Sequence, residues 1–88
     1  MQNDAMEKVI NIRTLIGTEA RLRPNADLIR QALKENEECR VIDFDGVNFV
    51  SRSFADELCN ILDENNQLRL KNESPLVKRM IDVVLASR

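Results

Sequence analysis

The apolar and polar positions of the chain follow two different spacings, and the first of them predicts strands. Lys8–Leu15 carries β-branched residues interrupted by polar ones, which predicts a partly buried strand. Arg40–Phe44 is nearly continuously apolar and precedes Asp45-Gly46, which is typical of a strand buried on both faces. Leu68–Lys71 alternates between apolar and basic residues, which predicts a half-exposed strand at a sheet edge.

The second spacing is helical and occurs after each of these strands. Apolar residues recur every three or four positions over Asn25–Asn36, which predicts a helix. A paired apolar stripe between Phe54 and Leu62 predicts a second, more strongly amphipathic helix. Ser53, with Asp56 three residues later, has the spacing of a capping box at the start of this helix.

Ser74 followed by Pro75 predicts the start of a third helix, since serine favours the N-cap and proline the first helical position. The apolar stripe of this helix, which we expect to face the core, comprises Leu76, Val77, Met80, Ile81, Val84 and Leu85.

The resulting order is β-α-β-α-β-α, in which helices separate successive strands. This order predicts an α/β fold with a small, largely parallel or mixed sheet and helices packed on it. We expect a single domain over residues 1–88, because the chain is too short for two cores and has no linker rich in proline or glycine. The polar segment 1–7 precedes this pattern and is a candidate for disorder.

Composition narrows the function classes. The chain has 88 residues, a net charge of -2, three phenylalanines, and neither tryptophan nor tyrosine. A slightly negative chain with few aromatics does not match the basic, stacking surfaces that bind nucleic acid. We therefore expect an aliphatic core and no nucleic-acid partner.

The chain also lacks the residues that many enzymes and metal sites use. It has no histidine, two glycines, and two cysteines, Cys39 and Cys59, that form no Cys-x-x-Cys pair. These features exclude histidine-based catalysis, a glycine-rich phosphate loop and the usual zinc sites. We expect no enzyme activity, cofactor or metal, and we interpret both cysteines as small buried hydrophobes in a reducing compartment.

No targeting or membrane-spanning segment is predicted. The first residues lack the apolar stretch of a signal peptide, and no apolar run reaches the roughly 18 residues that span a bilayer. We therefore expect a cytoplasmic protein that makes no membrane contact.

The connection from Asp45 to Ser53 is the candidate functional loop, because partners of parallel α/β sheets meet the loops at the carboxyl ends of the strands. Ser51 and Ser53 lie where the following helix starts and where backbone amides lack partners. Ser53 is either an N-cap that stabilises the helix by about 1 kcal/mol or a hydroxyl presented for phosphorylation at the positive end of the helix dipole. The spacing alone favours the cap.

Other polar residues have two interpretations each. Asp43 lies between apolar neighbours, and we expect it to accept hydrogen bonds from loop amides rather than to act as a general base. Asp43 and Asp45 suggest at most an incomplete metal pair, since no third ligand is apparent. Arg21 and Arg23 either bind an anion or an acidic partner, or belong to a solvated loop.

The segment DFDGVNFVSRSFADEL, within Val41–Leu58, resembles a bacterial STAS-like domain of unknown function. Members of that family carry a similar DF-x-G-V followed by S-x-S-FADEL. The segment is more distantly similar to the STAS domains of anti-sigma-factor antagonists, in which a strand ending D-L-S-x-V leads to D-S-S-G-L at a helix start. In those domains a partner kinase phosphorylates the second serine of the motif.

The resemblance assigns roles to individual positions. Asp43 matches the aspartate of the strand, Gly46 matches the glycine of the turn, and Ser53 falls on the phosphorylated serine. The resemblance therefore implies a switch at Ser53.

Three positions depart from the antagonist motif. Ser51 replaces its acidic residue, Arg52 replaces its first serine, and Phe54 replaces its glycine. A bulky Phe54 would change the access of a kinase to the neighbouring serine. Arg52 offers a counter-charge for a phosphate there, whereas Asp56 and Glu57 would repel it.

The resemblance implies a non-enzymatic protein-interaction and regulatory module of bacterial signalling, with a histidine-kinase-like ATPase or another regulator as its partner. The alternatives are a small-molecule-binding module and an accessory subunit of a larger enzyme or of a nucleic-acid-associated system. A homodimer through Leu68–Lys71 or an exposed helix face is a further prediction; the alternative is that Arg69 and Lys71 protect this edge from pairing. The expected partner-binding residues, with Ser53 as the phosphorylation candidate, are Asp43, Asp45, Gly46, Ser51, Arg52, Ser53 and Phe54.

Overall fold

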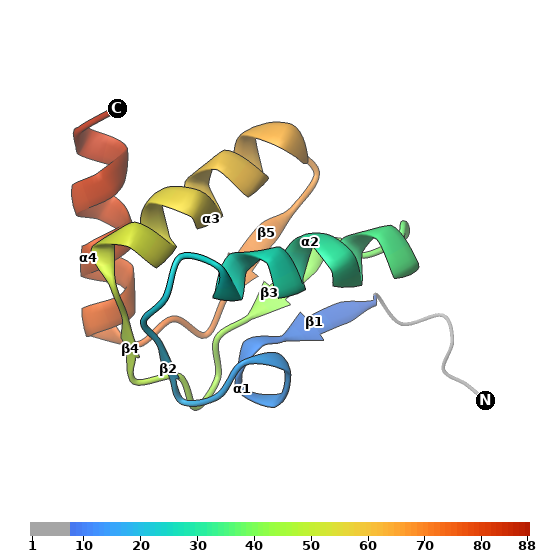
Figure 1. The fold of residues 1–88 in the computed structure, drawn as a ribbon, viewed down its shortest axis with the longest axis horizontal. Helices are drawn as coiled ribbons and strands as arrows, with labels where there is room; N and C mark the ends of the chain where they lie inside the picture. Colours follow the sequence, from blue (N-terminus) through green and yellow to red (C-terminus); the bar gives the residue numbers. More distant parts are fainter. Residues whose placement is uncertain (1–7) are drawn as a thin grey trace.

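The computed structural model describes residues 8–88, which form five strands and four helices (Figure 1). In chain order these are β1 (Val9–Asn11), α1 (Ile12–Leu15), β2 (Glu19–Ala20), α2 (Asn25–Glu35), β3 (Val41–Asp43), β4 (Phe49–Val50), α3 (Arg52–Glu64), β5 (Arg69–Lys71) and α4 (Pro75–Ala86). The expectation of disorder for residues 1–7 falls outside the described residues.

The main sheet has three parallel strands in the order β1-β3-β5. In its register Ile10 pairs with Ile42, and Ile42 pairs with Leu70. Helix α2 lies in the connection from β1 to β3, and α3 lies in the connection from β3 to β5. This alternation of parallel strands and helices confirms the predicted α/β class. The central strand β3 is buried on both faces at Val41 and Ile42, as its apolar run predicted.

A second, two-stranded sheet joins β2 to β4 in parallel. The backbone N–H of Asn48 donates to the carbonyl of Thr18 at 2.7 Å, and that of Ser51 donates to the carbonyl of Ala20 at 2.8 Å. Both strands have only two residues, which is too short for an alternating pattern, so the sequence did not reveal them. This pairing fixes the chain immediately before α3.

The prediction of the first strand is wrong for its second half, residues 12–15. Lys8–Leu15 was expected to be extended, but β1 ends at Asn11 and the chain turns into the short helix α1. The side chain of Asn11 accepts a hydrogen bond from the backbone N–H of Thr14 at 2.9 Å. This N-cap ends the strand, and Ile12 is then buried from a helical position.

The other predicted elements are confirmed within a few residues of their expected bounds. Ser74 caps α4 by accepting from the N–H of Val77 at 3.3 Å, and Pro75 occupies the first helical turn. Strand β5 is an edge strand with Arg69 and Lys71 exposed, as the alternation predicted. A homodimer through this edge stays a prediction.

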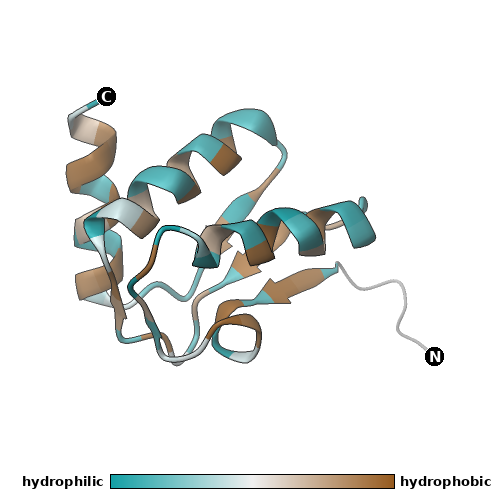
Figure 2. Ribbon diagram, viewed as in Figure 1, coloured by the Kyte–Doolittle hydropathy of each residue, from teal (hydrophilic) through white to brown (hydrophobic). Residues whose placement is uncertain are grey.

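The core is aliphatic apart from two phenylalanines, and the striped colouring of the helices in Figure 2 reflects their amphipathic character. Cys39 and Cys59 are 1% exposed, which confirms their burial. The largest fully buried side chains include Phe44, Phe54, Ile12, Ile29, Ile42, Leu58 and Ile61.

The predicted core stripe of α4 is too wide. Val77, Ile81 and Val84 are buried, whereas Leu76 is 66% and Leu85 is 52% exposed. A repeat of about 3.6 residues places these two leucines on opposite flanks of the buried stripe. Because α4 packs against α3 and β4 along one side, only the centre of the stripe is covered.

Within residues 8–88, no helix has the length and apolar character needed to cross a membrane.

Gly46 has a backbone requirement that explains the turn after β3. Its φ is +81°, and a Cβ at this position would lie 2.7 Å from Cδ of Arg13. We expect Gly46→Ala to lower the free energy of unfolding by about 1–3 kcal/mol, because of the strained φ and the displaced arginine. Urea denaturation measures this loss. The loss should be smaller in an Arg13→Ala background, and an equal loss in both backgrounds would contradict the contact.

Candidate functional site

The start of α3 is capped by Ser51. Its backbone is extended (φ -76°, ψ 164°), and its Oγ accepts a hydrogen bond from the N–H of Phe54 at 3.0 Å. The expectation that Ser53 caps this helix, in a box with Asp56, is therefore wrong. The pairing of β2 with β4 holds the N–H of Ser51 on Ala20, which sets the helix start at Arg52.

Ser53 consequently lies in the first turn of α3. Its Oγ is 3.2 Å from Oγ of Ser51, and its side chain is partly exposed. The first-turn amides of a helix have no intrahelical acceptors, so the local backbone field favours negative charge. This position leaves Ser53 partly exposed beside the positive end of α3.

The two neighbours of Ser53 lie in different environments. Arg52 is exposed, and its Nη2 donates to Oγ of Ser87 at the end of α4 at 3.3 Å. Phe54 is fully buried and belongs to the core. Its side chain therefore forms no part of a surface that a partner could reach.

The other candidates lie around the turn after β3. Asp43 Oδ1 accepts from the N–H of Asp45 at 2.9 Å and from Nδ2 of Asn72 at 3.0 Å. This confirms the expected bond from a loop amide and ties the ends of β3 and β5 together. Asp45 and Gly46 form the exposed part of the turn. Within residues 8–88, no three histidine, cysteine or acidic side chains come close enough to hold a metal ion.

The sequence candidates therefore form two groups rather than one site. In Figure 1, β4 runs from the turn after β3 to the start of α3, which places the two groups at opposite ends of this segment. The first group is Asp43, Asp45 and Gly46, and the second is Ser51, Arg52 and Ser53.

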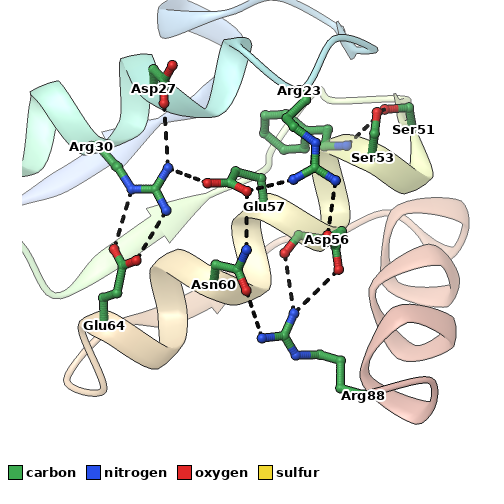
Figure 3. A network of polar contacts seen from close by, with 11 residues as sticks. Arg23, Asp27, Arg30, Ser51, Ser53, Asp56, Glu57, Asn60, Glu64 and Arg88 are labelled. Atoms are coloured by element: carbon green, nitrogen blue, oxygen red, sulfur yellow. Dashed lines mark hydrogen bonds and ion pairs between the residues drawn. The ribbon is translucent and has the colours of Figure 1, made fainter.

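A network of ion pairs on the outer edge of α3 was not expected from the sequence (Figure 3). At its centre is Glu57, whose side chain is 17% exposed. Glu57 accepts from Nη1 of Arg23 at 2.7 Å, from Nη1 of Arg30 in α2, and from Nδ2 of Asn60 at 3.2 Å. This one carboxylate therefore ties the residues before α2 and the middle of α2 to α3.

The network continues along α3 in both directions. Asp56 accepts from Nη2 of Arg23 at 3.0 Å, and Glu64 accepts from Nη2 of Arg30 at 3.3 Å. Arg88 donates to Asp63 at 2.8 Å, which brings the C-terminus onto the same edge. The acidic side chains of α3 thus face guanidinium groups from other elements.

Both arginines before α2 make ion pairs within the fold. Arg23 pairs with carboxylates of α3, and Arg21 pairs with Glu19 at 2.9 Å while its guanidinium lies 4.7 Å from the centre of the Phe49 ring. The repulsion expected between a phosphate on Ser53 and the acidic residues of α3 is reduced, because those charges are already paired.

The ionisation of Glu57 follows from these contacts. The hydrogen bond from Arg30 is the main reason that the pKa of Glu57 lies below its ordinary value of 4.5; desolvation opposes this shift, and the bond from Asn60 and the charge of Arg23 support it. Hydrogen bonds to Glu64 and then to Glu57 raise the pKa of Arg30. Burial raises the pKa of the Cys59 thiol, which keeps it in the unreactive protonated form.

A shallow apolar groove adjoins the start of α3. It has a volume of about 260 Å³ and lies between the β4–α3 connection and α4. Arg52 belongs both to this groove and to the Ser51–Ser53 corner. The other lining side chains include Phe49, Leu76, Arg79, Met80 and Val83.

Comparison of the chain with protein-family models, with curated proteins and with solved structures finds no match. The structure establishes the class: a small α/β domain with parallel strand pairing.

The two serines should differ in their contribution to stability. We expect Ser51→Ala to lower the free energy of unfolding by about 1 kcal/mol, because the N–H of Phe54 loses its acceptor. Ser53→Ala should cost much less, since its Oγ contacts only the other hydroxyl. Urea denaturation of both variants measures the difference, and a larger loss for Ser53→Ala would contradict the cap.

The lowered pKa of Glu57 predicts a pH dependence. Its carboxylate stabilises the fold above about pH 4.5, and this contribution is lost as the pH falls through the lower pKa of the folded state. Glu57→Gln should therefore be less stable than the wild type by about 1–2 kcal/mol at neutral pH. The variant should lose less further stability on acidification.

Unfolding in urea at a series of pH values from neutral to below 4 tests this prediction. Glu37→Gln is the matched control, because Glu37 is exposed and has no ion pair within residues 8–88. Superimposable acid profiles for the wild type and Glu57→Gln would contradict the role of the network.

Proposed function

We propose that this chain is a non-enzymatic protein-interaction module of bacterial signalling, in which phosphorylation of Ser53 switches the binding of a partner. The observation that carries the proposal is the position of Ser53, a partly exposed residue in the first turn of α3. The resemblance of Val41–Leu58 to STAS-like domains supports it. We propose membership of that family and a cytoplasmic setting on the same basis.

The first turn of α3 suits a phosphoryl group. The backbone amides and dipole of this turn attract negative charge, and the neighbouring Arg52 adds an exposed guanidinium. A phosphate on Ser53 would also break the contact of 3.2 Å between the two serine hydroxyls. Phosphorylation would therefore change both the charge and the hydrogen bonding of this corner.

The same corner argues against catalysis by this chain. The hydroxyl of Ser51 is engaged with Phe54 N–H and with Ser53, and no carboxylate or amine within residues 8–88 makes a hydrogen bond to either serine side chain. A serine nucleophile needs an adjacent base, and this sequence has no histidine to supply one. A hydroxyl that receives a phosphoryl group from a partner kinase needs no such base in its own chain.

The test combines the purified chain with a histidine-kinase-like ATPase of the class that the proposal implies as its partner, supplied with radiolabelled ATP. We expect label on the wild type and none on Ser53→Ala, with Ser53→Asp weakening the complex by roughly tenfold or more in calorimetry. Ser74→Asp is the matched control: it adds the same charge at another helix start, where aspartate also serves as a cap. It should bind as the wild type does.

Two results would contradict the proposal. One is that no radiolabel is transferred to the chain, or that Ser53→Ala is labelled as strongly as the wild type. The other is that both Ser53 variants bind the ATPase with the affinity of the wild type.

A further inference from the structure

Helix α4 has an apolar side that nothing in the described chain covers. Leu76, Met80 and Val83 recur at intervals of four and three residues, so they share one face over two turns. Leu76 is 66% and Val83 is 43% exposed. Phe49, from β4, continues this apolar surface across the groove. Contiguous exposed apolar surface of this kind is typical of interaction sites.

The size of the groove favours a protein segment over a small molecule. Its volume of about 260 Å³ lies below the range of about 300–1,000 Å³ that is usual for small-molecule pockets. It is open along α4 from Leu76 to Val83, a length of roughly 10 Å at the rise of an α-helix. Two turns of a partner helix would match this length, with apolar side chains at i, i+3 or i+4, and i+7.

The charged residues that line the groove indicate which partner residues would flank the apolar side chains of such a helix. Its lining includes Arg52 and Arg79 and no acidic residue. Arg52 donates to the hydroxyl of Ser87, and Arg79 makes no ion pair within residues 8–88. In contrast, Arg23, Arg30 and Arg88 are all paired with carboxylates on the edge of α3. The groove is therefore apolar at its centre and positively charged beside it.

This charge pattern argues against a second copy of the chain as the occupant. A twofold contact through α4 would pair the same surface with itself. It would bring the arginines at positions 52 and 79 of both copies together, with no acidic lining residue between them. Like charges at an interface are costly, whereas carboxylates from a partner would form strong, bidentate pairs with the same guanidinium groups.

We propose that the groove between β4 and α4 binds an amphipathic helical segment of a protein partner that carries Asp or Glu beside its apolar side chains. The inference rests on the proposed role as a partner-binding module, but not on phosphorylation of Ser53. Leucine-like side chains of the partner would pack beside Leu76 and Val83, and carboxylates of the partner would pair with Arg52 and Arg79.

The test selects peptides of about 16 residues, long enough for two or more helical turns, from a displayed random library on the wild-type chain. We expect the selected peptides to combine apolar residues at helical spacing with Asp and Glu. Fluorescence anisotropy of the synthetic peptides should show affinity losses of roughly tenfold or more for Leu76→Glu and for Arg79→Glu. Exchanging Glu for Lys in the peptide should restore binding to Arg79→Glu.

The chain offers matched controls on the same helix. Leu85→Glu and Lys78→Glu introduce the same charges at exposed positions of α4 that do not line the groove. Both should bind the peptides as the wild type does. Ser53→Ala should also bind normally, which separates the groove from the switch.

Three outcomes would overturn the inference: selected peptides rich in Lys and Arg, peptides that bind Leu76→Glu as tightly as the wild type, or no enrichment of binders. Binding of the wild type to phosphatidylglycerol vesicles that is lost in Leu76→Glu would identify a membrane as the occupant instead. Dimerisation lost in the same variant would identify a second copy. If the groove fails while the ATPase still labels Ser53, the proposed function stands without it.

Discussion

The start of helix α3 is held from two sides, and the candidate surfaces depend on how it is held. On the inner side Phe54 is fully buried, and on the outer side Glu57 accepts hydrogen bonds from Arg23 and Arg30. The β2–β4 pairing fixes the residue before the helix through the N–H of Ser51. With these three constraints in place, the helix must begin at Arg52. Arg52 is then exposed, and Ser53 is partly exposed.

The distribution of ion pairs explains why a chain with a net charge of -2 has a positively charged groove. Carboxylates on the edge of α3 are engaged by Arg23, Arg30 and Arg88 within the fold. Arg52 and Arg79, beside the groove, have no such partners in the described part of the chain. The charge that a partner would meet there is therefore opposite in sign to the net charge. The net charge alone predicts a negatively charged surface there.

The sequence predicts the elements that depend on neighbouring residues. It fails where contacts between residues far apart in the chain determine the structure. Helical spacing located α2, and the Ser74-Pro75 pair located the start of α4. The sequence predicts the wrong serine as the cap of α3, because the pairing of β2 with β4 sets the helix start. These two strands lie more than 25 residues apart in the chain, so no local pattern indicates that they pair. The ion pairs of Glu57 span 34 and 27 residues and leave no periodic signal. The groove was missed because Leu76 was counted as core.

The central claim is that the first turn of α3 is a surface switch that adjoins the groove. The most direct test compares amide NMR spectra of the unmodified chain with those of a chain produced with phosphoserine at position 53. We expect shifts concentrated in residues 49–57 and in α4 along the groove, reached through the contact of Arg52 with Ser87, with β1, β3 and β5 unchanged. Shifts spread across the sheet, or confined to the residues next to Ser53, would contradict the claim.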